Sequence, residues 1–66
     1  MNNRIQDLRK EKGLTQQGLA EKLGVSRQTI ISLENGKYNP SISLAYKLAK
    51  VFGLTIEDVF IFDEEV

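Results

Sequence analysis

The sequence predicts an all-α domain of four to five helices, and two kinds of observation support this fold class. Apolar residues recur at spacings of three and four, the pattern of one helix face, through most of the 66 residues. Residues that favour helix starts (Asn, Ser and Thr) and helix ends (Gly) punctuate this pattern. Helices this short are unstable alone. We therefore expect residues 1–66 to form one domain in which the helices share a core.

Capping residues delimit the expected helices. The expected ranges are about 3–12, 16–23, 26–35, 42–52 and 56–60. The expected N-caps are, in order, Asn2 or Asn3, Thr15, Ser26, Ser41 and Thr55. Asp58 can complete a short-range capping box with Thr55, whereas Gly18 stands where the second helix would need Glu or Gln. Gly18 should make that helix roughly 1 kcal/mol less stable than Ala would, and we interpret it as drift at a tolerant surface site.

Residues 15–36 read TQQGLAEKLGVSRQTIISLENG and have the spacing of two short helices joined by a tight turn. Their apolar residues are Leu19, Ala20, Leu23, Val25, Ile30 and Leu33. The opposite face is polar, with Gln16 opening the first helix and Arg27, Gln28 and Thr29 opening the second. Arg and Gln can make paired hydrogen bonds to guanine and adenine edges. We interpret residues 16–35 as a helix-turn-helix, although Arg and Gln are also ordinary formers of exposed helix.

The net charge is zero, but the charge is polarised along the chain. Residues 1–50 carry nine basic and four acidic side chains, whereas residues 51–66 carry five acids and no base. This distribution allows a basic face for DNA and an acidic far end. A solvated surface with a solubilising tail is the alternative interpretation.

The composition argues against several classes of protein. The chain has no Cys and no His, which removes disulfides, thiolate metal sites and the usual general base. Its one acid cluster, Asp63, Glu64 and Glu65, lies at the terminus, and no glycine-rich phosphate loop is present. We therefore expect no enzyme activity, cofactor, metal or small-molecule ligand. The polar start, MNNRIQDLRK, is not a signal peptide, and no apolar run would span a membrane, so we expect a cytoplasmic protein.

Three motifs in order carry a family resemblance: LRKEKGLTQ, then LAEKLGVSRQTIISLENGK, then NPS followed by LAYKLAKVFGL. Over about residues 5–60 the sequence resembles the lambda-repressor and Cro-like helix-turn-helix family, also called the XRE family. The resemblance implies a bundle of four or five helices and a sequence-specific transcriptional regulator, commonly dimeric. Gly18 and Ile31 depart from the family pattern. Ile31 is expected either to touch a thymine methyl or a partner, or to be partly buried at the helix margin.

The resemblance also implies roles for individual residues. Base contacts are expected from Arg27, Gln28, Thr29 and Ser32. Backbone or supporting contacts are expected from Gln16, Gln17, Ser26, Lys37, Tyr38 and Asn39. For Tyr38 a packed ring in a turn loop is an equal alternative. Arg9 and Glu34 match positions that form an ion pair between the first and third helices, so we expect their role to be architectural.

The C-terminal run of residues 59–62, VFIF, is continuously apolar and suits a short strand or a docking tail. We expect residues 55–66 to form a dimerisation tail in which Ile56, Phe60, Ile61 and Phe62 contact a second copy. The alternative is that these side chains cap the monomer's own core. The predicted function is a repressor that binds a palindromic operator in double-stranded DNA as a homodimer. An antitoxin-like or coactivator-like protein-binding module is the alternative.

Overall fold

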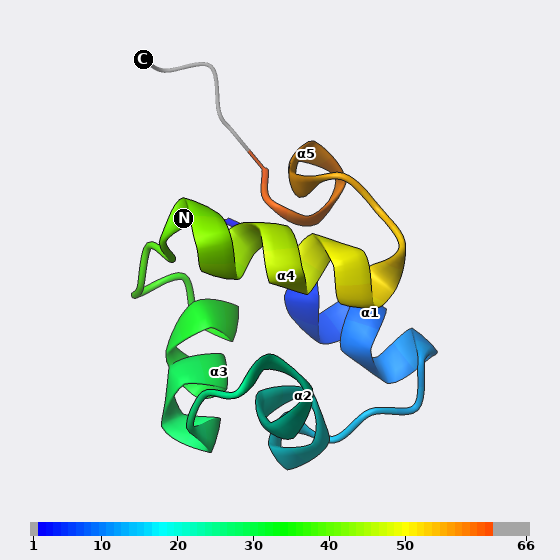
Figure 1. The fold of residues 1–66 in the computed structure, drawn as a ribbon, viewed down its shortest axis with the longest axis vertical. Coiled ribbons are helices and arrows are strands. Elements are labelled where there is room, and N and C mark those ends of the chain that lie inside the picture. Colours follow the sequence, from blue (N-terminus) through cyan, green and yellow to red (C-terminus); the bar gives the residue numbers. More distant parts are fainter. Residues whose placement is uncertain (1, 62–66) are drawn as a thin grey trace.

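Five helices make up the computed structural model, which describes residues 2–61 (Figure 1). They are α1 (Ile5–Glu11), α2 (Gln16–Leu23), α3 (Arg27–Glu34), α4 (Ile42–Phe52) and α5 (Ile56–Val59). The longest helix, α4, crosses the middle of the molecule, with α2 and α3 below it and α5 above it in this view. The predicted all-α class is confirmed, and α2 has the predicted bounds.

Side-chain caps begin four of the five helices, as predicted. The side chains of Thr15, Ser26, Ser41 and Thr55 each accept a hydrogen bond from the backbone N–H three residues later. At α5 the Asp58 carboxylate also accepts from the Thr55 backbone N–H, which completes the predicted capping box. These two Thr55 donors, first the backbone N–H and then the hydroxyl, hold the pKa of Asp58 below its ordinary value.

The start of α1 differs from the prediction. Arg4 occupies its N-cap position and makes no side-chain cap, and Asn3 lies one residue further out. The Asn3 side-chain Oδ1 accepts from the Ile5 N–H at 3.1 Å, while the Asn3 Nδ2 donates to the Leu33 backbone carbonyl at the end of α3 at 2.7 Å. The helix begins later than expected because Asn3 ties the N-terminal segment to α3.

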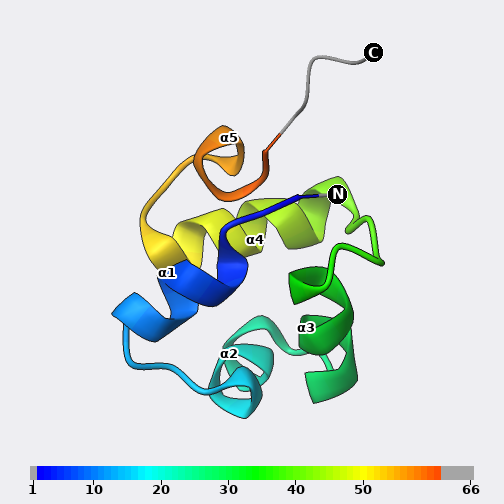
Figure 2. The ribbon, with the colours of Figure 1, turned by 180° about the vertical axis from the view of Figure 1, so that it is seen from behind.

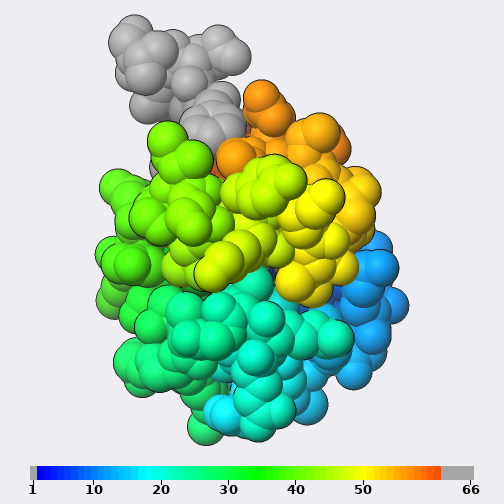
Figure 3. Space-filling model, viewed as in Figure 1, coloured from blue at the N-terminus to red at the C-terminus, as the bar shows by residue number. Residues whose placement is uncertain are grey.

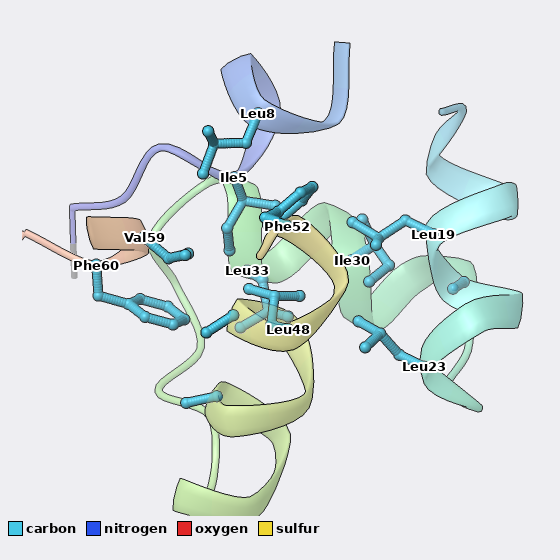
Figure 4. Close-up of a cluster of buried hydrophobic side chains, with 13 residues drawn as sticks. Ile5, Leu8, Leu19, Leu23, Ile30, Leu33, Leu48, Phe52, Val59 and Phe60 are labelled. Carbon is cyan, nitrogen blue, oxygen red and sulfur yellow. The ribbon is translucent and has the colours of Figure 1, made fainter. Parts of the chain in front are cut away.

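The core lies between the helices, and Figure 4 shows its side chains converging from all five of them. Its buried members are Ile5, Leu8, Leu19, Ala20, Leu23, Ile30, Leu33, Ala45, Leu48, Ala49, Phe52, Val59 and Phe60. Ile42 has the spacing of the α4 core residues but is 83% exposed. Because side chains tilt toward the helix N-terminus, this first residue of α4 overhangs the core.

The C-terminal run pairs with the N-terminal segment of the same chain. The Arg4 N–H donates to the Val59 carbonyl and the Ile61 N–H donates to the Asn2 carbonyl, both at 2.8 Å. This pairing forms an isolated antiparallel bridge instead of the suggested strand, and it places the N-terminal segment across α4 in the view from behind (Figure 2). Phe60 is 2% exposed, so it lies in the monomer's own core and has almost no surface to offer a partner. Phe62 lies outside the described residues.

Candidate nucleic-acid interface

The turn between α2 and α3 is built by local hydrogen bonds. Gly24 adopts φ 72°, a left-handed conformation that glycine accepts readily, and its N–H bonds to the Ala20 and Glu21 carbonyls at the end of α2. The Val25 N–H also donates to the Ala20 carbonyl, at 3.0 Å. Ser26 then caps α3. Two successive caps thus turn the chain within three residues and give α3 a fixed direction relative to α2.

Burial of one face fixes which side of the motif remains free. Leu19 of α2 and Ile30 and Leu33 of α3 are completely buried. The first turn of α3 therefore presents Arg27 and Gln28 to solvent. Thr29 and Ser32 are partly buried, at the margin of the same face. Ile31 is also partly buried, which matches the second of its two interpretations.

Ser26 and Thr29 bond to each other as well as to the helix start. The Thr29 N–H donates to the Ser26 Oγ at 3.2 Å, and the two hydroxyl oxygens are 3.0 Å apart. The Ser26 hydroxyl is therefore chiefly a cap. The hydroxyl of Thr29 is occupied by Ser26, so its methyl group is the part best suited to meet a thymine methyl.

An open hollow lies between the first turns of α2 and α3. It is lined by Arg9, Thr15, Gln16, Gln17 and Arg27. Two guanidinium groups and two amides are donors of the kind that bind phosphate oxygens. The predicted supporting residues Gln16 and Gln17 therefore lie beside the predicted base reader Arg27.

The loop after α3 presents three further predicted residues. Gly36, at φ 73°, ends the helix, and the Lys37 N–H donates to the Ser32 carbonyl at 3.0 Å. Lys37, Tyr38 and Asn39 are all exposed, and Tyr38 retains 43% of its surface. The loop is thus held to the end of α3 by its backbone while its side chains remain accessible.

The expected ion pair between Arg9 and Glu34 is present. The Arg9 Nε donates to the Glu34 Oε2 at 2.7 Å, and the two side chains are only 10% and 5% exposed. A second guanidinium nitrogen, Nη1, donates to the Leu14 carbonyl at 2.9 Å, which holds the segment between α1 and α2. The pair therefore joins α1, α3 and the start of α2.

Sequence reasoning missed one contact in this network. The Gln16 Nε2 donates to the Glu34 Oε1 at 3.1 Å. Gln16 begins α2 and Glu34 ends α3, 18 residues apart, so no helical spacing signals this bond. It links a residue expected at the DNA to the buried ion pair.

These features define a class of protein: a small helix-turn-helix domain with the polar first turn of its second helix exposed. A family model described as helix-turn-helix matches residues 5–59. The chain belongs to this family, the XRE family of helix-turn-helix transcriptional regulators, which are DNA-binding proteins. No helix within residues 2–61 has the length and apolar character needed to cross a membrane.

Curated relatives and solved structures are similar over most of the chain. An uncharacterised HTH-type transcriptional regulator of Archaeoglobus fulgidus is 58% identical over 65 residues, covering 98% of this chain and 93% of the relative. One of Methanocaldococcus jannaschii is 55% identical, covering 98% of each chain. The biofilm master regulator SinR, solved in complex with DNA, has a TM-score of 0.74 and 38% identity over 82% of this chain and 87% of that one. The restriction-modification controller protein C.AhdI of Aeromonas hydrophila has a TM-score of 0.75 and 33% identity over 83% of each chain.

Proposed function

We propose that this regulator is a repressor that binds a palindromic operator in double-stranded DNA as a homodimer, with α3 in the major groove. One observation carries the proposal: Arg27 and Gln28 are exposed on the first turn of α3, beside a hollow lined by hydrogen-bond donors. The SinR neighbour, solved in complex with DNA, supports the same use of the fold.

Base recognition is assigned to the first turns of α3. Arg27 can donate to O6 and N7 of guanine, and Gln28 can pair with N6 and N7 of adenine. Thr29 offers its methyl group to thymine, and Ser32 lies one turn further along α3. Each good bidentate pair contributes about 1–3 kcal/mol of discrimination between bases.

Contacts to the sugar-phosphate backbone are assigned to the residues around α3. These are Gln16, Gln17, Ser26, Lys37, Tyr38 and Asn39. Gln16 and Gln17 approach from the start of α2, and the loop residues 37–39 approach from the other end of α3. Backbone contacts on both sides of a recognition helix fix its register in the groove.

A homodimer is supported by an exposed apolar face on α4. Ile42 and Tyr46, one turn apart, are 83% and 56% exposed. A groove between α4 and α5 continues this face, and Figure 3 shows the side chains of the two helices next to each other. The groove is lined by Tyr46, Ala49, Lys50, Leu54, Thr55, Ile56 and Glu57. A solvated apolar face of this kind is typical of a protein interface.

The charges in the groove support a second copy of the chain as the partner. Lys50 and Glu57 line the same groove and carry opposite charges. In a twofold interface every contact occurs twice, once in each direction. Lys50 of one subunit can therefore pair with Glu57 of the other, while Glu57 of the first pairs with Lys50 of the second. Of the residues predicted to dimerise, Ile56 lies in this groove and Ile61 is 45% exposed nearby in sequence.

The position of this face suits a palindrome. In Figure 1, α2 and α3 lie at one end of the molecule and α5 at the other, with α4 between them. A twofold axis beside α4 that runs parallel to the outward direction of α3 would leave α3 of both subunits on one side of the dimer. Two half-sites about 34 Å apart then present successive major-groove segments to the pair.

Selection of bound duplexes from a random DNA pool tests the base readers. Arg27→Ala or Gln28→Ala should weaken binding to the selected duplex by about 1–3 kcal/mol per half-site and relax preference at one base position. Lys37→Ala should weaken all duplexes alike and flatten the salt dependence. Lys12→Ala, which removes the same charge from the end of α1, is the control. If neither α3 variant alters the selected motif, α3 does not read the groove and the protein-binding alternative replaces this function.

Equilibrium sedimentation tests the dimer and its interface. Ile42→Asp should shift the protein to monomer at micromolar concentrations, because it places a charge in the apolar face, and Ile61→Asp is the matched control. If only Ile61→Asp dissociates the dimer, the interface is the C-terminal tail. If the wild-type protein is monomeric with and without its selected duplex, the homodimer is excluded. Weaker repression of a reporter by the dissociated variant would support the role as a repressor.

A further inference from the structure

The buried Arg9–Glu34 pair has a third member that faces the proposed DNA surface. The Glu34 Oε2 receives the Arg9 Nε at 2.7 Å, while its Oε1 receives the Gln16 Nε2 at 3.1 Å. The Arg9 Nη2 also reaches Oε1, at 3.5 Å. The Glu34 side chain is 5% exposed, and both of its oxygens accept hydrogen bonds from within the protein. Gln16 is partly exposed and lines the hollow with Arg27.

This arrangement determines which way the Gln16 amide points. An ionised carboxylate only accepts hydrogen bonds, so the NH2 end of the amide must face Glu34 and the carbonyl end must face away. The reversed amide would bring two acceptors together inside a site from which water is largely excluded, and an unpaired buried acceptor is strongly unfavourable. The chemistry of Glu34 therefore removes the twofold ambiguity that a free glutamine side chain has.

From this geometry we infer that Glu34 is a positioning residue for DNA recognition, acting through Gln16. The inference rests on the proposed DNA binding. With its Nε2 held, Gln16 presents a carbonyl oxygen as an acceptor and one remaining N–H as a donor. The acceptor suits a guanidinium, an amide of a base-reading side chain or an exocyclic amine of a base, and the donor suits a phosphate oxygen. Arg9 takes part by neutralising Glu34, so that this carboxylate does not repel the nearby phosphates.

Gln17 is a natural control because it shares the location of Gln16 but not its partner. It follows Gln16 in α2 and lines the same hollow. Its Nε2 donates to the Glu21 Oε2, an exposed contact at 3.3 Å within α2. A general effect of Glu34 on the stability of α2 would reach both glutamines, whereas positioning would reach Gln16 alone.

A double-mutant cycle in DNA affinity tests the inference. Glu34→Gln retains the shape but supplies an amide that can donate as well as accept, so the Gln16 amide can then reverse. With Gln16 present, Glu34→Gln should weaken binding to the selected duplex by about fivefold; in a Gln16→Ala background it should have almost no further effect. In a Gln17→Ala background the fivefold loss should persist. Affinities are compared at one salt concentration and at a temperature where urea titrations show every variant folded.

A second measurement needs neither DNA nor a substitution in the buried pair. In NMR spectra of the wild-type domain, the side-chain amide of Gln16 should show relaxation typical of an ordered group, and that of Gln17 should be more mobile. If Glu34→Gln lowers DNA affinity equally in the presence of Gln16 and in the Gln16→Ala background, Glu34 acts only through the fold and the inference is wrong. A mobile Gln16 amide in the NMR spectra would also overturn it. If the wild-type domain selects no DNA motif, the proposed function fails. An ordered Gln16 amide would in that case still show that Glu34 orients Gln16, but on a surface for a different ligand.

Discussion

Replacing Arg9 by Ala should destabilise the domain far more than removing a surface charge. The Arg9 guanidinium meets the Glu34 carboxylate at 2.7 Å and the Leu14 carbonyl at 2.9 Å, and both charged side chains are at least nine-tenths buried. Ala would leave Glu34 charged with Gln16 as its remaining side-chain donor in the described structure. Breaking a buried pair by removing one partner destabilises by about 3–5 kcal/mol, against about 0–1 kcal/mol for an exposed pair.

That loss is large relative to the stability of so small a domain. Typical values of 0.05–0.15 kcal/mol per residue give roughly 3–10 kcal/mol for a chain of this length. Urea unfolding followed by circular dichroism should therefore show a much lower midpoint for Arg9→Ala. Lys10→Ala, at an exposed neighbouring position in α1, should change stability by less than about 0.5 kcal/mol.

A double substitution separates loss of charge compensation from loss of packing. Arg9→Met combined with Glu34→Leu removes both charges while retaining apolar volume, and such replacements are often neutral or stabilising. The double variant should recover most of the stability lost in Arg9→Ala. If the midpoint of Arg9→Ala equals that of Lys10→Ala, the ion pair does not support the fold and the reasoning is refuted.

Three further substitutions test local features of the fold. Gly18→Ala should raise the free energy of unfolding by about 0.5–1 kcal/mol, because Ala favours the helical conformation more than Gly does. The new Cβ would lie 3.1 Å from the Thr15 hydroxyl, but α3 and α4 hold side chains at the matching position after their caps. A lower urea midpoint for the variant would contradict this. Asn3→Ala should lower it by about 1–2 kcal/mol, because the Leu33 carbonyl loses a donor at 2.7 Å, and an unchanged midpoint would count against that bond. Asp58→Asn should flatten the loss of stability as the pH falls below about 4. The lowered pKa of Asp58 gives stability that is complete above the unfolded-state value of about 3.9 and disappears as the pH falls through the folded-state value. Identical slopes for the variant and wild type would refute this.

The parts of the fold that sequence predicts well are those set by local chemistry. The caps of α2, α3, α4 and α5 are bonds between residues three apart, and the ends of α2 and α4 are glycines at φ 72° and 69°. All of these can be identified within a few residues of sequence. Exposure of the first turn of α3 follows almost as directly, because the buried positions of α3 leave Arg27 and Gln28 on the free side.

Predictions failed where a distant segment decides the outcome. Asn2 or Asn3 was expected to cap α1, but Arg4 occupies the N-cap position, and the Asn3 side-chain amide donates to the Leu33 carbonyl 30 residues away. Phe60 was expected in an interface because its neighbours are apolar, but pairing with the N-terminal segment buries it. Ile42 fits the helical spacing of a core residue, but spacing cannot show that the first turn of α4 extends past the core. Each failure concerns the surroundings of a residue, which sequence periodicity does not contain.

The contact between Gln16 and Glu34 shows the same limit within the site itself. The residues proposed to read bases are chosen by their type and by their place after a cap, and the sequence contains both kinds of information. The Gln16 amide near them is held by a carboxylate 18 residues further along the chain, which also belongs to a buried ion pair. If Glu34 orients Gln16 as inferred, two relatives that share the residues at positions 27, 28, 29 and 32 should differ in DNA preference where position 34 differs. On this proposal, sequence specificity depends on the residues that support the first turn of α3 as well as on α3 itself.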